Sequence, residues 1–513
     1  MVNNTNTNNK RIAKNTIFLY FRMIVTMLVG LYTSRIVLAE LGVEDFGIQN
    51  VVGGVVTMFG FINASMTTST QRFLTYELGR NNVERLKLVF AGSLNIHIGI
   101  GLVIVLLAET IGLWLVNTQL VIPDNRMFAA NIVYQVSVLS FFLGIVQTPY
   151  SAAIVAHEKM NIYAYFTFLD VIFKLLNAYL LVVIEADKLI VFSIILFFIA
   201  NIDRLIYQIY CKRNFVEARF KMFWNREMYT SLAGFAGWNI FGSVAWMIRG
   251  QGMSVLINMF FGPVVNAAEG VARQVHSAVM GFVTNFLMAV NPQVTKYYAQ
   301  GNLKEMEELV LSASRLSCLL LLVLSLPIML NVDYILNLWL EEVPCYAAIF
   351  VNLSFVDQMV NILLGQLFIT SLMATGNIRK YQVWVSLVIM LVLPVSYVAL
   401  KLGGTPESIY YIMVAVTAFS GLARFYFCKI QIGYSYSNLL RGNLLPTVLT
   451  ALMASIPSVL LKFYVFNNSN FVDFIACSVI VVLITLLSVL VFGVKKSERS
   501  YLIVFLKNKL HKQ

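Results

Sequence analysis

One apolar stretch carries charged and polar side chains at the spacing of a helix. Asn266, Glu269, Arg273 and His276 follow one another by three or four residues, so in a helix they lie on one face. The surrounding segment, 264–290, is otherwise apolar and long enough to cross a hydrocarbon core. Each charge at the centre of such a helix costs roughly 2.5–3.5 kcal/mol on insertion scales. Two interpretations stay open: a Glu269–Arg273 ion pair that neutralises itself between helices, or a face that lines a polar cavity.

The composition of the chain is that of an integral membrane protein. Of its 513 residues, 59% are hydrophobic and only 12% are charged, against about 25% charged residues in soluble domains. Five scattered cysteines lack the spacing of metal or redox motifs, so we expect no metal and no cofactor. The sequence shows no nucleotide-binding motif and no nucleophile–base pair, and it therefore does not predict an enzyme.

Fourteen apolar stretches predict an all-α integral membrane protein with about 14 transmembrane helices. They cover residues 15–39, 46–76, 88–116, 127–156, 163–184, 189–210, 228–257, 263–298, 309–330, 345–375, 378–400, 407–429, 444–466 and 471–494. The polar segment 1–14 is predicted to be a disordered cytoplasmic tail before an uncleaved first helix.

The distribution of Lys and Arg predicts the orientation of these helices. With the N-terminus inside, 24 of the 37 basic residues fall on the cytoplasmic side, and only Arg126, Lys188, Lys401 and Lys462 fall outside. This asymmetry is typical of a multi-pass protein with both termini in the cytoplasm. The net charge of +12 is therefore explained by topology, and no nucleic acid partner is predicted.

Nine basic residues lie inside the apolar stretches. Arg22, Arg249 and Arg273 lie deepest, and intramembrane cations usually face a water-filled cavity or an anion. Lys174 follows Asp170 by four residues, which predicts a local ion pair.

Three further arginines, Arg72, Arg315 and Arg424, lie within a turn or two of the predicted cytoplasmic side. We expect their long side chains to reach the interface, as basic side chains near helix ends do.

The chain repeats itself weakly. The segment 78–86 is echoed by 300–306, and 156–163 by 374–381, both at an offset near 220 residues. Six spans per repeat give both halves the same orientation, which favours a binding site between them. At this offset Glu269 corresponds to Gln49, which begins a second small and polar face that ends at Asn63. Glycines on that face are equally explained by close helix packing.

The predicted organisation follows from this repeat. It consists of an N-terminal tail (1–14), a six-helix half (15–212), a cytoplasmic linker (213–227), a second six-helix half (228–430), two added helices (431–494) and a basic cytoplasmic tail (495–513).

The motif Gly-Val-Glu-Asp-Phe-Gly-Ile at 42–48, the basic start and the two halves with two added helices resemble a known superfamily. It is the multidrug/oligosaccharidyl-lipid/polysaccharide (MOP) exporter superfamily, and within it the bacterial polysaccharide transporters that include O-antigen flippases. The resemblance implies a V-shaped, MATE-like bundle in the bacterial inner membrane. It further implies transport of an undecaprenyl-diphosphate-linked oligosaccharide, an O-antigen or capsule repeat unit, from the inner to the outer leaflet.

In this hypothesis cations in a central cavity bind the diphosphate, because one guanidinium group can donate to two phosphate oxygens at once. The candidate substrate-binding residues are Arg22, Gln49, Asn50, Asn63, Arg249, Glu269, Arg273, His276 and Asn285. The expected partners are the lipid-linked oligosaccharide, the bilayer and a coupling ion, H⁺ or Na⁺. The alternatives are a multidrug or cation antiporter of the same superfamily and, with less support, a membrane polysaccharide polymerase.

Overall fold

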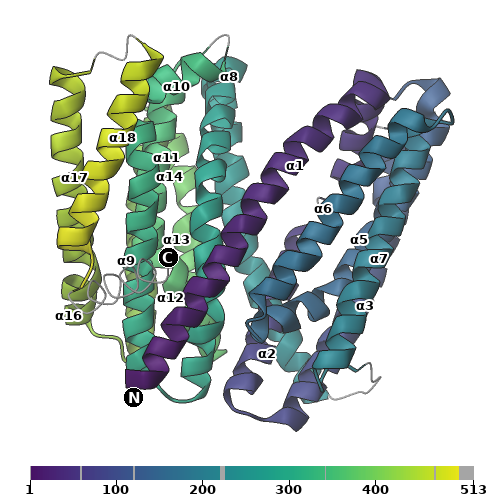
Figure 1. Cartoon of the computed structure of the whole chain (residues 1–513), viewed down its shortest axis with the longest axis horizontal. Helices are drawn as coiled ribbons and strands as arrows, with labels where there is room; N and C mark the ends of the chain where they lie inside the picture. Colours follow the sequence, from purple (N-terminus) through teal and green to yellow (C-terminus); the bar gives the residue numbers. More distant parts are fainter. Residues whose placement is uncertain are drawn as a thin grey trace, which may run out of the picture. The chain divides into compact units, whose positions relative to one another are not determined.

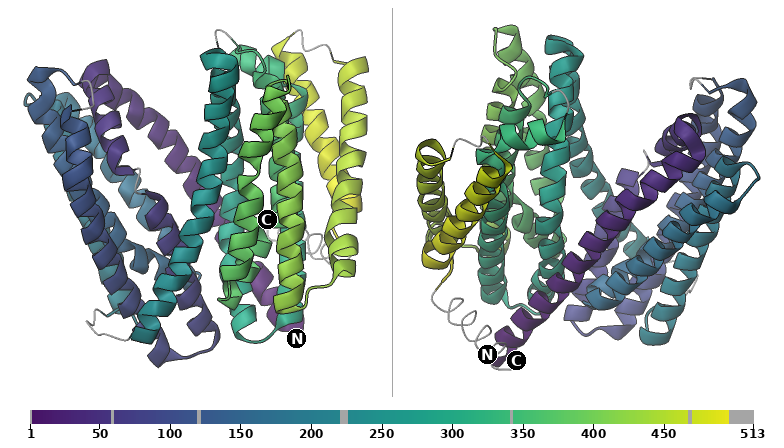
Figure 2. Two further views of the ribbon diagram at one scale, coloured as in Figure 1. Left: turned by 180° about the vertical axis from the view of Figure 1, so that it is seen from behind. Right: turned by 45° about the horizontal axis from the view of Figure 1, so that its top comes forward.

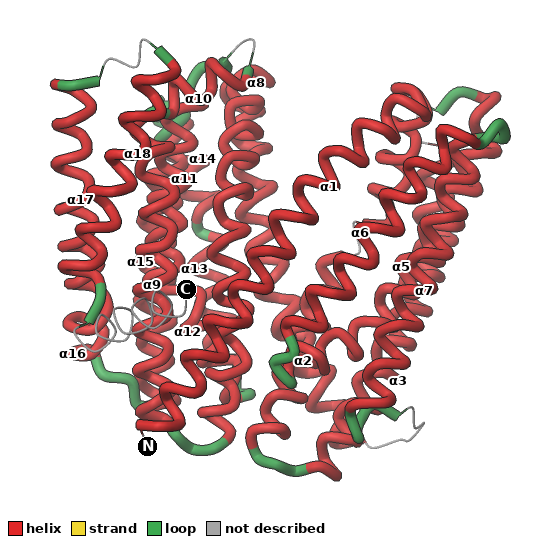
Figure 3. Tube along the Cα trace, in the orientation of Figure 1, coloured by secondary structure: helices red, strands yellow, loops and turns green. Residues whose placement is uncertain are grey.

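The structure, a computed structural model, describes residues 2–57, 60–118, 122–219, 226–340, 343–466 and 470–495. In these residues the chain forms helices, turns and loops, and no β-strand (Figure 3). Helices satisfy their own backbone hydrogen bonds, which the hydrocarbon core of a membrane cannot do. The predicted all-α fold is confirmed.

Each of the fourteen predicted spans falls on helical residues in the described part of the chain. Eleven stretches are long and apolar enough to cross a membrane, and 15–30 forms a shorter apolar helix. Two predicted spans, 46–76 and 263–298, are helical but are not among the eleven. These are the two stretches that carry the polar faces. The count of fourteen therefore stays a prediction.

The predicted disordered tail is wrong for residues 2–14, which belong to helix α1 (Val2–Thr57). Extending an existing helix is much easier than nucleating one. The apolar helix that begins near Asn15 can therefore continue into the polar segment that precedes it.

The chain divides into two compact units, residues 1–243 and 244–513. The boundary lies inside helix α8 (Arg226–Ala299), and not in the predicted linker 213–227.

Contacts of the first part of α8 explain this boundary. The Asn239 amide donates to the Ser65 carbonyl oxygen at 3.1 Å, and the hydroxyls of Ser243 and Ser65 lie 3.0 Å apart. The ring of Phe235 meets the ring of Phe73 edge to face, with centroids 5.5 Å apart. The start of the predicted second half therefore packs with unit 1.

Unit 1 contains α1, α2 (Gly60–Gly79), α3 (Val83–Leu107), η1 (Ala108–Gly112), α4 (Leu113–Thr118), η2 (Asp124–Arg126), α5 (Met127–Ala156), α6 (Met160–Val183), α7 (Lys188–Asn214) and the start of α8. Helix α5 is central, because it packs against α1, α2, α3 and α7. Helix α6 lies beside α1 and α7 (Figure 1).

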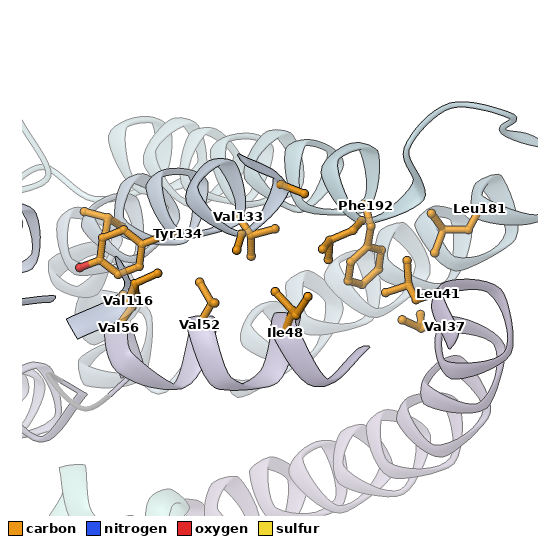
Figure 4. Packing of buried hydrophobic residues seen from close by; sticks show 14 of the residues in the cluster. Val37, Leu41, Ile48, Val52, Val56, Val116, Val133, Tyr134, Leu181 and Phe192 are labelled. Carbon is orange, nitrogen blue, oxygen red and sulfur yellow. The ribbon is translucent and has the colours of Figure 1, made fainter. Parts of the chain in front are cut away.

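Helix α1 turns back on itself at Gly42. The backbone there has φ +74° and ψ 171°, a conformation that glycine adopts without strain and other residues avoid. Figure 4 shows the result: residues before and after the turn point into one hydrophobic cluster. Its members include Val37, Leu41, Ile48, Val52, Val56, Val133, Tyr134, Leu181 and Phe192.

Ion pairs hold both sides of this turn. Arg126 in η2 binds Asp45 and Asp187, at 2.5 and 2.7 Å, and Lys188 binds Glu40 at 2.7 Å. Asp187 also accepts the backbone N–H groups at the start of α7. The Arg126 guanidinium and these N–H groups hold the pKa of the Asp187 carboxyl below its ordinary value.

Unit 2 contains the rest of α8, α9 (Leu303–Leu330), α10 (Val332–Trp339), α11 (Ala347–Asn361), η3 (Ile362–Gln366), α12 (Leu367–Thr375), α13 (Arg379–Met390), α14 (Val392–Lys401), α15 (Ser408–Ile432), α16 (Tyr436–Leu439), η4 (Leu440–Leu444), α17 (Leu445–Tyr464), α18 (Phe471–Ser488) and η5 (Val489–Gly493). Helix α15 is central and packs against α11, η3, α12, α13 and α14. Helices α17 and α18 lie side by side and pack against α9 (Figure 2).

A π-helical turn, η3, joins α11 to α12 in the membrane-spanning part of unit 2. Such a turn leaves carbonyl oxygens outside the regular helix ladder. Here the Ser314 hydroxyl donates to the carbonyl of Ile362 at 2.9 Å, and the Asn443 amide donates to that of Leu363 at 3.1 Å. On the other side Gly421 of α15 allows close approach to Leu364. These contacts fix α11 and η3 against α15.

Candidate functional site

The Glu269–Arg273 ion pair predicted from spacing is present on α8. Nε and Nη2 of Arg273 lie 3.1 and 2.5 Å from Oε1 of Glu269. The Glu269 side chain is 5% exposed, whereas that of Arg273 is 45% exposed. The carboxylate is therefore buried, and the guanidinium extends from it toward accessible space.

Helix α8 doubles back beside this pair. Nη2 of Arg273 also reaches the carbonyl oxygen of Gly250 at 3.4 Å. In a straight helix the 23 residues between them would span about 34 Å. A reversal between these residues therefore brings the neighbour of Arg249 to the Glu269–Arg273 pair.

Arg249 forms a second ion pair, which joins three helices. Its Nη2 donates to both Asp357 oxygens, at 2.8 and 2.7 Å, and to the Thr417 hydroxyl at 2.9 Å. The Thr417 hydroxyl donates in turn to Asp357 at 2.5 Å. Arg249 and Asp357 are both buried. The sequence does not predict this partnership, because 108 residues separate the two charges and no local spacing indicates it.

Trp246 lies between two guanidinium groups. The guanidinium carbon of Arg249 lies 4.8 Å from the centre of its ring, and that of Arg424 lies 5.8 Å away. Both distances are typical of cation–π contacts. We call Trp246, Arg249, Asp357, Thr417 and Arg424 the arginine cluster of unit 2.

The predicted snorkelling of Arg315 and Arg424 is wrong. Their relative exposures are 0% and 1%. Nη1 of Arg315 donates to the carbonyl oxygen of Gly442, between α9 and η4. Arg424 lies on α15, which neighbouring helices cover on several sides. Side chains enclosed in this way have no path to the interface, whatever their depth along the helix.

His276 belongs to the same neighbourhood. Its ring centre lies 6.2 Å from that of Phe355, and its side chain hydrogen bonds Gln358, the residue after Asp357. Tyr410 of α15 lies within electrostatic range of Glu269, Arg273 and Asp357. The structure thus brings together four of the predicted residues, namely Arg249, Glu269, Arg273 and His276.

Asn285 lies further along α8. Its amide donates to the Gly281 carbonyl oxygen at 2.8 Å, within its own helix. Twelve residues separate it from Arg273, which corresponds to about 18 Å along a helix. We therefore place Asn285 outside the site around Arg273.

The predicted residues of unit 1 contact three different helices. Arg22 lies over the Tyr163 ring of α6 at 4.9 Å. Gln49 accepts the Ser193 hydroxyl of α7, and Asn63 accepts the Thr148 hydroxyl of α5, both at 3.0 Å. These amide oxygens hold helices together. The Asn50 side chain lies outside the described part of the structure.

Charged residues of α1, α6 and α7 lie near Tyr207. The predicted Asp170–Lys174 ion pair is present at 2.8 Å. The Asp203 carboxyl on α7 lies within electrostatic range of Asp170 and Lys174. Tyr207 lies within electrostatic range of Arg22 and of both carboxyls. No group of three or more His, Cys, Asp or Glu side chains suited to a metal ion occurs among the residues that the structure describes.

Solved structures with a similar fold are transporters. An outward-facing multidrug resistance MATE family transporter of the MOP superfamily has a TM-score of 0.70 and 13% sequence identity, over 84% of this chain and 96% of its own. MATE in the bent conformation has a TM-score of 0.72 and 13% identity, over 85% and 96% of the two chains.

A third structure is a MOP superfamily transporter from Pyrococcus furiosus, described as having a binding pocket of reverse polarity that suggests a different function. Its TM-score is 0.68 and its identity 13%, over 85% of this chain and 97% of its own. No protein-family model matches the chain. No curated protein matches it. The predicted MATE-like fold is confirmed by these structures.

Proposed function

We propose that the chain is a membrane exporter that moves an undecaprenyl-diphosphate-linked oligosaccharide, such as an O-antigen or capsule repeat unit, across the bacterial inner membrane. The MATE-like transporter fold supports an exporter that works by alternating access. The observation that carries the substrate class is the charge of the site in unit 2. Around α8, α11 and α15, three arginines meet two carboxylates.

The two carboxylates are already paired. Asp357 binds Arg249, and Glu269 binds Arg273, so neither is available to neutralise an organic cation. The positive charge of Arg424 is therefore not balanced by either carboxylate. An excess of positive charge favours an anionic substrate, and the planar guanidinium suits phosphate oxygens. The described reverse polarity of the Pyrococcus furiosus pocket supports the use of pocket charge to separate functions on this fold.

A diphosphate needs such a site to cross the bilayer. An ion that enters hydrocarbon alone loses its hydration at a very high cost. Cations on membrane-spanning helices replace part of that hydration. The polyprenyl chain needs no such help, because it is soluble in the lipid.

A multidrug or cation antiporter is the second candidate. The fold is equally consistent with it, and the observation in its favour is the pair of carboxyls Asp170 and Asp203 in unit 1. Carboxylates on membrane-spanning helices are the groups that an organic cation requires.

In the proposed flippase this carboxyl pair has a different role. Two carboxyl groups that lie within electrostatic range of each other, with Lys174 bound to one of them, can take up and release a shared proton. We therefore propose H⁺, and not Na⁺, as the coupling ion, with Asp170 and Asp203 as its binding site.

Reconstitution tests the two functions in one preparation. Proteoliposomes would contain the full chain, an undecaprenyl-diphosphate-linked oligosaccharide and ethidium, with and without a proton gradient. Exposure of the sugar to an added glycosidase reports flipping, and fluorescence reports ethidium movement. We expect gradient-dependent flipping and no ethidium transport above that of protein-free vesicles.

Ethidium transport without movement of the glycolipid would identify the multidrug exporter instead. Flipping that responds to a sodium gradient, but not to a proton gradient, would retain the substrate class and contradict the assignment of the coupling ion.

A further inference from the structure

Arg424 is a buried cation that no described residue neutralises. It is 1% exposed, and Nε, Nη1 and Nη2 all lack a hydrogen-bond partner within the described part of the chain. Arg315, equally buried in unit 2, differs because it donates to the Gly442 carbonyl oxygen. Burial of an unpaired charge is costly and contributes nothing to packing that an apolar residue would not. The position of Arg424 is therefore unfavourable for folding alone.

The space beside Gly365 holds the Arg424 head group and the side-chain oxygen of Asn361. Nη1 of Arg424 and Oδ1 of Asn361 each lie 2.7 Å from the point that a Cβ on Gly365 would occupy. Oδ1 of Asn361 is also buried without a hydrogen-bond partner. Any side chain at position 365 would displace the guanidinium of Arg424 or the amide oxygen of Asn361. Glycine in η3 therefore provides the room that the Arg424 head group occupies.

Trp246 is the side chain between Arg424 and Arg249, and unlike Arg424 it is only partly buried. Arg249 is held by Asp357 and Thr417 and is neutralised there. The arginine of the cluster that has no acid thus has a partly buried aromatic side chain as its neighbour.

We propose that Arg424 binds an oxyanion of the transported lipid diphosphate. The proposal rests on the proposed function and assigns its anion-binding residue. A guanidinium with three open nitrogens can donate to two oxygens of one phosphate group. Arg249, which Asp357 neutralises, holds the neighbouring helices together, and Arg273 lies where accessible space begins.

Binding of undecaprenyl diphosphate without sugar tests this assignment, with undecaprenol as the uncharged control. The full chain in nanodiscs is titrated with each lipid, and the dissociation constant and Tm are measured. Arg424→Gln should weaken diphosphate binding about 10- to 100-fold, the effect of one or two charge-assisted hydrogen bonds. It should leave undecaprenol binding unchanged. Its Tm should rise, because an unpaired buried charge is removed.

Arg315→Gln is the matched control, since it removes an arginine of equal burial from the same unit. Its Tm should fall, because a hydrogen bond is lost, and its dissociation constant should equal that of the wild type. Gly365→Ala keeps the charges of Arg249 and Arg424, but its added methyl group fills space beside the Arg424 head group. It should therefore also weaken diphosphate binding. This second variant carries the test if Arg424→Gln does not fold.

Wild-type affinity for undecaprenyl diphosphate in Arg424→Gln, or in Gly365→Ala when the first variant does not fold, would overturn the assignment. The proposed function would stand in that case. It would fail instead if the wild type bound undecaprenyl diphosphate no better than undecaprenol.

Discussion

The two ion pairs of unit 2 differ in the exposure of their arginines. Arg249 and Asp357 are both buried, and the Thr417 hydroxyl hydrogen bonds both of them. Arg273 is 45% exposed, although its partner Glu269 is buried. A fully enclosed pair holds helices together, whereas a guanidinium at accessible space can exchange its carboxylate for a ligand. We therefore propose a structural role for Arg249–Asp357 and contact with the substrate for Arg273.

For the enclosed pair, breaking one side should cost more than removing both. Arg249→Met leaves Asp357 buried without its partner and should destabilise the protein by about 3–5 kcal/mol. Arg249→Met combined with Asp357→Leu should recover most of this loss. Thermal unfolding in detergent measures both. Equal loss of stability in the single and the double variant would contradict the structural role.

For the exposed arginine, loss of transport should occur without loss of folding. Arg273→Ala should abolish flipping, and Arg273→Lys should restore part of it, because lysine keeps the charge but lacks the two-pronged donor. Flipping in proteoliposomes and the Tm are measured together.

The double variant Glu269→Gln with Arg273→Met separates charge from folding, because it leaves no carboxylate unpaired. We expect a folded and inactive protein. Normal flipping by this variant would exclude substrate binding by Arg273.

At the scale of elements, the turn of α1 depends on charges from two other segments. Gly42 permits the backbone reversal, and the hydrophobic cluster fixes its direction. Arg126 and Lys188 then hold Asp45 and Glu40 on either side of the turn. Because these ion pairs join η2 and α7 to α1, they should stabilise this end of unit 1 as one piece.

Acid should loosen this end of the unit. The folded pKa of Asp187 is lowered, chiefly by Arg126, so its contribution to stability is present above the unfolded value near 3.8. It is lost as the pH falls from there through the folded pKa. The Tm should therefore be lower at pH values below about 4 than at neutral pH.

Arg126→Gln should lower the Tm at neutral pH and make the remaining acid dependence shallower. Lys174→Gln is a suitable control, because its ion pair with Asp170 lies within another helix of the same unit, α6. An acid dependence that Arg126→Gln leaves unchanged would show that other groups cause it.

At the scale of the whole molecule, charge distribution predicts the orientation of the helices in the membrane. The similarity to solved transporters shows that the architecture is MATE-like. The two parallel six-helix halves and the position of both termini stay predictions. They can be tested without a substrate.

Reporter fusions test this topology. Fusions within 117–123 and 331–344 should report an external location, and those within 213–226 or at the C-terminus a cytoplasmic one, as the positive-inside rule requires. A cytoplasmic signal at either of the first two loops would contradict the predicted helix count.

Local patterns in the sequence were sufficient for the class of the protein and for two of its contacts. Apolar length predicted the helices, because a membrane-spanning helix is defined by its own residues. The pairs Glu269–Arg273 and Lys174–Asp170 were predictable, because residues four apart in a helix meet whatever surrounds them.

Only the tertiary structure decided which distant groups meet. The partnership of Arg249 with Asp357 requires α8 and α11 to pack side by side, and no spacing within either helix encodes it. Depth along a helix likewise suggested that Arg424 reaches the interface, but its neighbours enclose it. Burial is a property of all the elements around a residue, and the sequence of one helix cannot supply it.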